Sequence, residues 1–125
     1  METLNIPGTE ATPLVEFDPT DSVLMIEGKM LPEDVEKFFQ PINNWVDSYF
    51  KQAEPLNVLF RLYYYNTSSF KRIYILCKKL NTYYAIGKKI KIRWEYAEGD
   101  DYAKRDAEEL FEDFTYPYEI TAVNE

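Results

Sequence analysis

Four consecutive polar side chains, Asn66-Thr67-Ser68-Ser69, have the types and the spacing to hold a phosphate group. They stand between an apolar segment, residues 56–65, and an amphipathic segment, residues 70–86. Hydroxyl and amide side chains are typical of a helix N-cap, where free backbone N–H groups and the positive end of the helix dipole attract anions. Such a position favours a bound phosphate or a phosphorylated hydroxyl. The same residue types cap many helices without a regulatory role, so the segment alone leaves both interpretations open.

The side chains that usually perform catalysis are scarce in this chain. It has no histidine and one cysteine, Cys77, so it lacks the commonest general base and the ligands of ordinary zinc sites. Acidic residues cluster around 95–101, where a predicted loop meets a predicted helix start and where acids are typical of solvated caps. The sequence contains neither a phosphate-binding glycine loop nor a nucleophile motif. We therefore expect a protein that is not an enzyme and that has no metal site and no cofactor.

The two segments around the polar residues predict a strand followed by a helix. Residues 56–65, LNVLFRLYYY, are rich in β-forming types and too few for a stable isolated helix. They are apolar on both alternating faces except at Asn57 and Arg61, which predicts a central strand covered on both sides. Residues 70–86 carry an apolar stripe at helical spacing that includes Cys77, which indicates a helix with a buried thiol.

The rest of the chain predicts further strands and helices in alternation. Strands are predicted near residues 4–6, at 14–18 and 22–27 as a hairpin that Gly28 ends, at 90–96 and at 118–123. Apolar stripes predict helices over about 32–49 and 102–114, the first with a kink or break near Phe38 because Pro41 lies inside it. Trp45 and Trp94 occupy the apolar phase of their segments, and we expect both to be buried.

This order of elements favours an α/β fold, with a small mixed β-sheet and about three helices packed on it. Strands joined through a helix are expected to run parallel, whereas the hairpin strands must be antiparallel. The 125 residues, of which 46% are hydrophobic and 17% aromatic, predict a single domain over residues 1–125 with a real core.

Charge and hydropathy exclude several classes of partner. A net charge of −8 argues against nucleic acid, because neutralising phosphates needs a basic face. The first thirteen residues lack the basic and apolar regions of a signal peptide, and no apolar run reaches membrane-spanning length. We therefore expect a cytoplasmic protein without membrane insertion, whose partners are other proteins.

Five segments of the chain resemble one known family. They are IPGTEATP at 6–13, an aromatic helix around Trp45, LYYYNTSS at 62–69, IRWEY at 92–96 and FTYPYEI at 114–120. Together they are similar to the SiaC-type regulatory phosphoproteins of bacteria, and the similarity runs from about residue 5 to about residue 121. The motifs IPGTxxTP and NTSS are specific in combination, although either alone would be weak.

The resemblance implies a STAS-like fold and a partner switch in bacterial signal transduction and biofilm regulation. It implies that a Ser/Thr protein kinase phosphorylates the threonine of the NTSS motif and that a PP2C-type phosphatase removes the phosphate. That threonine is Thr67 here, with Ser68 and Ser69 as alternatives. It also implies that the unphosphorylated form binds an effector such as a diguanylate cyclase.

The surface expected to bind partners surrounds the phosphorylation site. Its predicted residues are Tyr65, Asn66, Ser68, Ser69, Phe70, Thr9 and Thr12. For the two threonines of IPGTEATP, a purely structural turn is an equally good interpretation. An alternative function of another class is a small-molecule-binding module that uses the tyrosines at 63–65 as a pocket wall.

Overall fold

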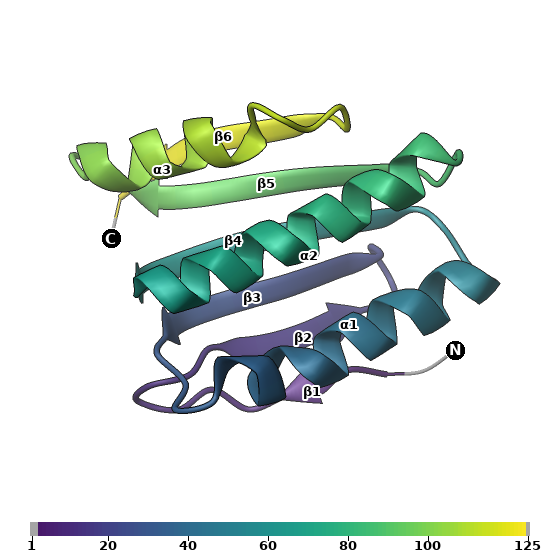
Figure 1. The fold of residues 1–125 in the computed structure, drawn as a ribbon, viewed down its shortest axis with the longest axis horizontal. Coiled ribbons are helices and arrows are strands. Elements are labelled where there is room, and N and C mark those ends of the chain that lie inside the picture. The colour runs from purple at the N-terminus through teal and green to yellow at the C-terminus, as the bar shows by residue number, and fades with distance from the viewer. Residues whose placement is uncertain (1–2, 125) are drawn as a thin grey trace.

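The computed structural model describes residues 3–124, within which six strands form one mixed sheet in the order of the sequence (Figure 1). The strands are β1 (Asn5–Ile6), β2 (Leu14–Asp18), β3 (Val23–Met30), β4 (Leu56–Tyr65), β5 (Ile90–Ala97) and β6 (Tyr118–Val123). The helices are α1 (Val35–Gln52), α2 (Thr67–Ala85) and α3 (Asp101–Phe111). The mixed α/β fold predicted from the order of elements is confirmed. Residues 1, 2 and 125 of the predicted domain lie outside the described residues.

Parallel pairing brings the functional segments to one edge of the sheet. Strands β1, β2 and β3 pair antiparallel, whereas β3, β4, β5 and β6 pair parallel. Each parallel step is made through one helix, and all three helices lie on the same face of the sheet (Figure 1). The carboxyl ends of the parallel strands therefore meet at one edge, and every helix begins there. Residues 66–69 and the start of α3 consequently lie on the same side of the molecule.

The sheet is covered on one face only, so the prediction that β4 is covered on both sides is wrong. Its alternate residues Leu56, Val58, Phe60 and Leu62 are buried beneath the helices, whereas Asn57, Leu59 and Arg61 are partly exposed on the other face. The open face stays compatible with water because its side chains are largely charged. A row of ion pairs crosses four strands there, from Glu27 through Arg61, Glu95 and Arg93 to Glu119.

The core between the helices and the sheet is aromatic. Trp45 and Trp94 are 3% and 1% exposed, which confirms their predicted burial. Trp45 stacks on Tyr49 from the same helix, and Trp94 meets Phe111 of α3 edge-on. Cys77 is buried, as predicted, and burial raises the pKa of its thiol to about 12. None of the described helices combines the length and the hydropathy needed to cross a membrane.

Helix α1 runs without interruption through Pro41, so a break near Phe38 is wrong, whereas the alternative of a kink stays a prediction. Proline in a helix interior costs about 3 kcal/mol, because it removes one backbone hydrogen bond and crowds the preceding turn. The opposite face of the same helix buries six large side chains, each stabilising by roughly 1.5–3 kcal/mol. These are Phe39, Ile42, Trp45, Val46, Tyr49 and Phe50. Packing therefore outweighs the local penalty, and Pro41 itself lies exposed on the solvent side.

We expect the Pro41→Ala variant to be more stable than the natural sequence by about 1–2 kcal/mol. Alanine restores the amide that can donate to the Lys37 carbonyl, which recovers most of the ~3 kcal/mol helix penalty. The greater freedom of alanine in the unfolded chain offsets roughly 0.4–1 kcal/mol of that gain. Urea unfolding measures the difference, with Gln40→Ala at the exposed neighbouring position as control. A Pro41→Ala variant no more stable than the control would contradict the argument.

Gly28 does not end β3 as the sequence predicted. The strand continues to Met30, with an irregular register between Gly28 and Lys29 that leaves Tyr63 of β4 without a partner in the ladder. Gly28 has a φ of +129°, and a Cβ atom there would lie 3.2 Å from the Pro13 Cα atom. Glycine is therefore required for β3 to pass the start of β2 and continue to the edge where α2 begins.

Candidate functional site

Asn66 caps helix α2 and fixes the backbone of the polar segment. Its side-chain oxygen Oδ1 accepts a hydrogen bond of 2.9 Å from the Ser69 N–H, and its carbonyl accepts one of 2.9 Å from the Phe70 N–H. The Ser68 hydroxyl donates to the same Oδ1 atom over 3.2 Å. Asn66 is therefore the N-cap, and Thr67 occupies the first helical position, beside backbone donors that the helix leaves unpaired.

The three hydroxyl groups of this segment differ in accessibility. Thr67 and Ser68 are exposed, whereas Ser69 is fully buried. The Ser69 Oγ atom has no hydrogen-bond partner among the described residues and faces the protein interior. An enzyme that approaches the folded domain can therefore reach the hydroxyls of Thr67 and Ser68 but not that of Ser69.

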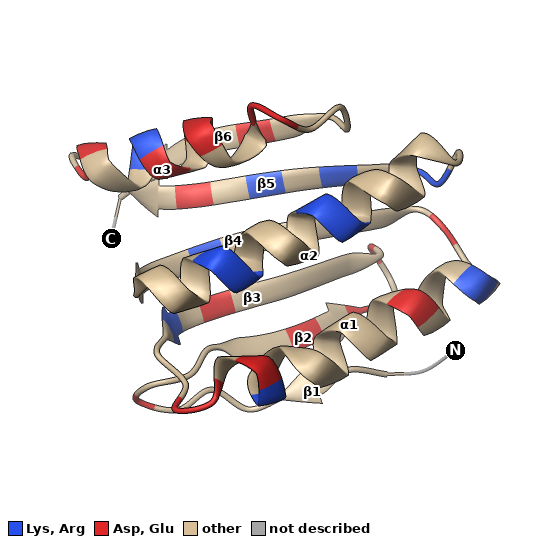
Figure 2. Cartoon of the chain, viewed as in Figure 1, with Lys and Arg blue, Asp and Glu red and all other residues tan. Residues whose placement is uncertain are grey.

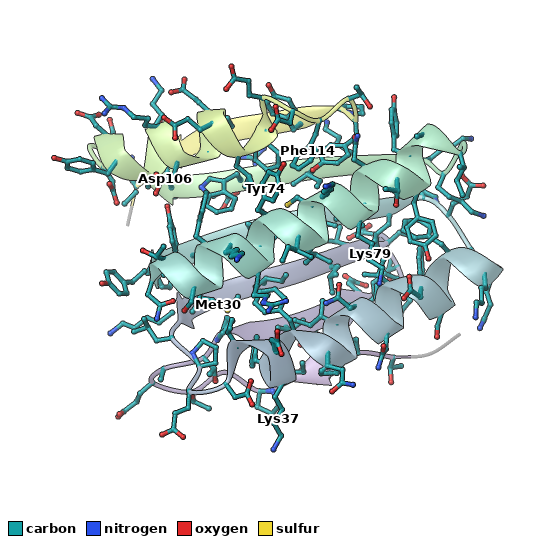
Figure 3. The ribbon with its side chains drawn as sticks, viewed as in Figure 1. Met30, Lys37, Tyr74, Lys79, Asp106 and Phe114 are labelled. Carbon is teal, nitrogen blue, oxygen red and sulfur yellow. The ribbon has the colours of Figure 1, made fainter. Side chains whose placement is uncertain are left out.

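A small pocket of about 310 Å³ lies beside Thr67. Tyr65, Asn66, Thr67 and Phe70 line it from β4 and the start of α2, and Asp106 lines it from α3. Asp106 lies on the side of α3 that faces α2 (Figure 3). Four of the residues predicted from the sequence thus share one pocket with Asp106, which the sequence analysis did not identify.

Tyr65 lines this pocket and packs against the core. Its ring stacks on Phe70 with centroids 5.4 Å apart and meets Trp94 edge-on at 6.0 Å. Its hydroxyl donates a hydrogen bond of 2.7 Å to the Asp106 Oδ2 atom. Burial, followed by this hydrogen bond, raises the pKa of Tyr65 well above its usual value. The hydroxyl therefore stays protonated at neutral pH and remains a donor to Asp106.

The charges around Thr67 are unevenly distributed. Figure 2 shows that the first turn of α2 carries no charged side chain, whereas acidic residues are frequent along α3. Positive charge follows within the next turn of α2, where Lys71 is exposed and Arg72 forms an ion pair with Glu36 of α1. The hydroxyl of Thr67 therefore lies between an acidic helix and the basic side chains of its own helix.

Thr9 and Thr12 form a separate turn on the same edge. The Thr9 and Thr12 Oγ1 atoms lie 2.7 Å apart, and the Thr12 N–H donates to Thr9 Oγ1 over 2.9 Å. The turn is attached to the chain after β3, because the Leu31 N–H donates to the Ala11 carbonyl over 2.7 Å. In the described structure no hydrogen bond joins either threonine to residues 66–70. The end of β3 lies between the turn, which precedes β2, and the pocket at the end of β4.

The tyrosines at 63–65 do not form one pocket wall. Tyr65 packs on the helix-covered face, whereas Tyr63 borders a hollow of about 750 Å³ on the open face. Arg61 lines that hollow, and its guanidinium already donates to Glu27 and Glu95, at 2.9 and 2.6 Å. The Arg61 guanidinium is paired within the protein, so among the described residues that line the hollow no charged group is free to orient a small molecule.

The chain is similar in sequence and in fold to proteins of one known family. Residues 6–123 match the model of the SiaC family of regulatory phosphoproteins. A protein of Pseudomonas aeruginosa (strain UCBPP-PA14) is 32% identical over 126 residues, which covers the whole of both chains. The crystal structure of apo-SiaC from Pseudomonas aeruginosa is similar with a TM-score of 0.89 and 32% identity, covering 98% of this chain and 100% of that chain. The crystal structure of the diguanylate cyclase SiaD in complex with its activator SiaC, from the same organism, is also similar. Its TM-score is 0.90 at 31% identity, covering 96% of this chain and 99% of that chain.

Proposed function

The chain belongs to the SiaC family of regulatory phosphoproteins, and on that premise we propose that it is a partner switch controlled by phosphorylation of Thr67. Membership makes the chain a regulatory protein rather than an enzyme. In the proposed cycle a Ser/Thr protein kinase transfers the terminal phosphoryl group of ATP to the Thr67 Oγ1 atom, which loses its proton. A PP2C-type phosphatase hydrolyses the ester with water, which restores the hydroxyl and releases inorganic phosphate.

The observation that carries this proposal is the position of the Thr67 hydroxyl. It is exposed, it stands at the first helical position of α2, and it borders a pocket at the edge where three helices begin. A phosphothreonine there adds about −1.5 to −2 charges without entering the core. Phosphorylation therefore changes the surface that a partner would meet without placing the phosphate in the core.

The proposed effector is a diguanylate cyclase, and the unphosphorylated form is the one that binds it. A SiaC of similar fold is the activator in the complex with the cyclase SiaD, which supports this choice of partner. The proposed contact surface comprises the exposed rim around Thr67, namely Asn66, Ser68 and the accessible edges of Tyr65 and Phe70. The Thr9–Thr12 turn extends it along the same edge, whereas Ser69 contributes only by packing beneath it.

Phosphopeptide mapping combined with effector binding tests the proposal. Protein recovered from its native cytoplasm should include a fraction heavier by one phosphoryl group, and fragmentation should place that group on Thr67. The unmodified fraction should bind the organism's diguanylate cyclase and raise its activity, and the modified fraction should do neither. Mapping to Ser68 would move the site by one residue, whereas equal binding by both fractions would reject the switch.

A further inference from the structure

Two tyrosine–aspartate hydrogen bonds connect α3 and the residues just after it to neighbouring elements, and only one of them borders Thr67. Tyr65 at the end of β4 donates to Asp106 over 2.7 Å, and Tyr74 in α2 donates to Asp113 over 3.4 Å. The first lies in the pocket shared with Thr67. The second lies seven residues further along the chain, beyond the end of α3, where Tyr74 also packs against Phe114 (Figure 3).

The Asp106 carboxylate is held at the Thr67 pocket without a compensating cation. Among the described residues it forms no ion pair, and Tyr65 is its hydrogen-bond partner. Asp100, at the start of α3, adds a second negative charge near the Tyr65 hydroxyl. The basic residue of α2 closest in sequence to Thr67 is Lys71, which is exposed and makes no ion pair in the described structure. The pocket is therefore suited to a neutral hydroxyl and unfavourable for a second anion.

We infer that Asp106 is the positioning residue that reads the modification state of Thr67. Thr67 and Asp106 line one small pocket, so a phosphate on Thr67 and the Asp106 carboxylate repel each other. The repulsion opens the hydrogen bond between Tyr65 and Asp106 and releases the amino-terminal half of α3 from β4. Phosphorylation then alters the surface twice, directly through its own charge and indirectly through α3. This inference rests on the proposed phosphorylation of Thr67.

The release of α3 would move Tyr102, an exposed residue that a binding partner could contact. Tyr102 lies one turn before Asp106 on α3 and is 82% exposed. Tyr64, at the end of β4, is 57% exposed on the same edge of the sheet. Tyrosine is enriched in protein interfaces and frequently contributes most of their binding energy. Releasing α3 would displace the Tyr102 ring, so phosphorylation would change the shape of the effector surface as well as its charge.

Phosphothreonine incorporated at position 67 during translation tests the inference without the natural kinase. The second pKa of a phosphothreonine is ordinarily about 6. A ³¹P NMR titration should give a pKa higher by roughly half a unit or more in the natural background than in Asp106→Asn. Asparagine still accepts the Tyr65 hydrogen bond, so the substitution removes the charge alone. Asp113→Asn is the matched control, because it changes the other tyrosine–aspartate pair, and it should behave like the natural background.

Hydrogen exchange of the α3 amides provides the second measurement. Phosphothreonine at position 67 should accelerate exchange at Ala107 in the natural background and in Asp113→Asn but not in Asp106→Asn. Tyr65→Phe removes the hydrogen bond, so its α3 should exchange fast already without phosphate and gain nothing further from it. Two results would overturn the role of Asp106. One is a phosphate pKa that is identical in all backgrounds, and the other is a phosphate-induced acceleration of Ala107 exchange that is as large in Asp106→Asn as in the natural background. Absence of phosphate on Thr67 in cells would instead reject the proposed switch. That outcome is distinguishable from a failure of the Asp106 role, because phosphothreonine incorporated during translation does not depend on a cellular kinase.

Discussion

Replacing Thr67 with glutamate is expected to weaken binding of the effector by at least about tenfold while leaving the domain folded. The new carboxylate stands at the first helical position, where a negative charge stabilises the helix by roughly 0.3–1 kcal/mol. It also introduces a charge into a contact surface, and like or unpaired charges at an interface cost several kcal/mol. Each ~1.4 kcal/mol lost corresponds to a tenfold weaker affinity.

Two quantities test this expectation, the affinity for the effector and the thermal unfolding temperature, each measured for Thr67→Glu, Thr67→Val and the natural sequence. Thr67→Val keeps the shape of the side chain and removes the hydroxyl, so it should bind the effector and resist phosphorylation. Both variants should unfold within a few degrees of the natural protein, since Thr67 is exposed. If Thr67→Glu and the phosphorylated protein both bind the effector normally, Thr67 does not control binding.

The second large effect is expected on the open face of the sheet, where Arg61→Leu should destabilise the fold by about 1–3 kcal/mol. Arg61 connects Glu27 and Glu95, and the Glu95 side chain is only 8% exposed. Removing one partner of a buried ion pair costs about 3–5 kcal/mol. The Arg61 side chain is 36% exposed and Arg93 still pairs with Glu95 over 2.9 Å, so solvent and the second arginine reduce the loss.

Two further variants separate the ion pair from the bulk of the side chain. Arg105→Leu removes an arginine from the exposed surface of α3 that forms no ion pair in the described structure, and it should change stability by less than about 0.5 kcal/mol. Adding Glu95→Gln to Arg61→Leu removes the buried carboxylate that has lost one of its two arginines, and it should recover part of the loss. Urea unfolding gives all three values. An equal loss in Arg61→Leu and Arg105→Leu would contradict the account of Glu95.

The Glu95 carboxylate makes the stability of the fold depend on pH. Burial alone would raise the pKa of Glu95, but the hydrogen bonds from Arg61 and Arg93 outweigh it and hold the pKa below its usual value of 4.5. A carboxylate with a depressed pKa stabilises the fold above its unfolded pKa, and that contribution disappears as the pH falls through the folded pKa. The free energy of unfolding should therefore decrease below about pH 4.5, and Arg61→Leu should flatten that decrease.

The strands were predictable because their limits are set by local chemistry. The bounds of β2, β4 and β6 are those predicted, since each strand alternates or is continuously apolar and is delimited by proline or asparagine. The sequence also predicted an N-cap within residues 66–69, and the structure assigns it to Asn66, whose amide oxygen accepts from the N–H three residues on. Residues close in sequence thus determined both the position and the start of α2.

The features that sequence reasoning missed depend on contacts between distant residues. The uncovered face of β4 follows from all three crossovers lying on one side, which no single strand specifies. The pairing of Tyr65 with Asp106 joins residues 41 positions apart. One signal was available, because a helix that follows a parallel strand begins at the same sheet edge as its neighbours. That rule places the acidic start of α3 beside the start of α2, although it does not select Asp106.

The burial of Ser69 has a consequence for how a kinase would have to recognise its substrate. In a synthetic peptide that spans residues 62–72 all three hydroxyls are free, and such a peptide would offer Ser69 as readily as Thr67. In the folded domain Ser69 is inaccessible, and Thr67 is held in helical rather than extended backbone. Peptide libraries are therefore a poor guide to the specificity of the proposed kinase. The proposed kinase would have to recognise the folded domain. A change that unwinds the first turn of α2 would expose Ser69 and alter which hydroxyl is modified.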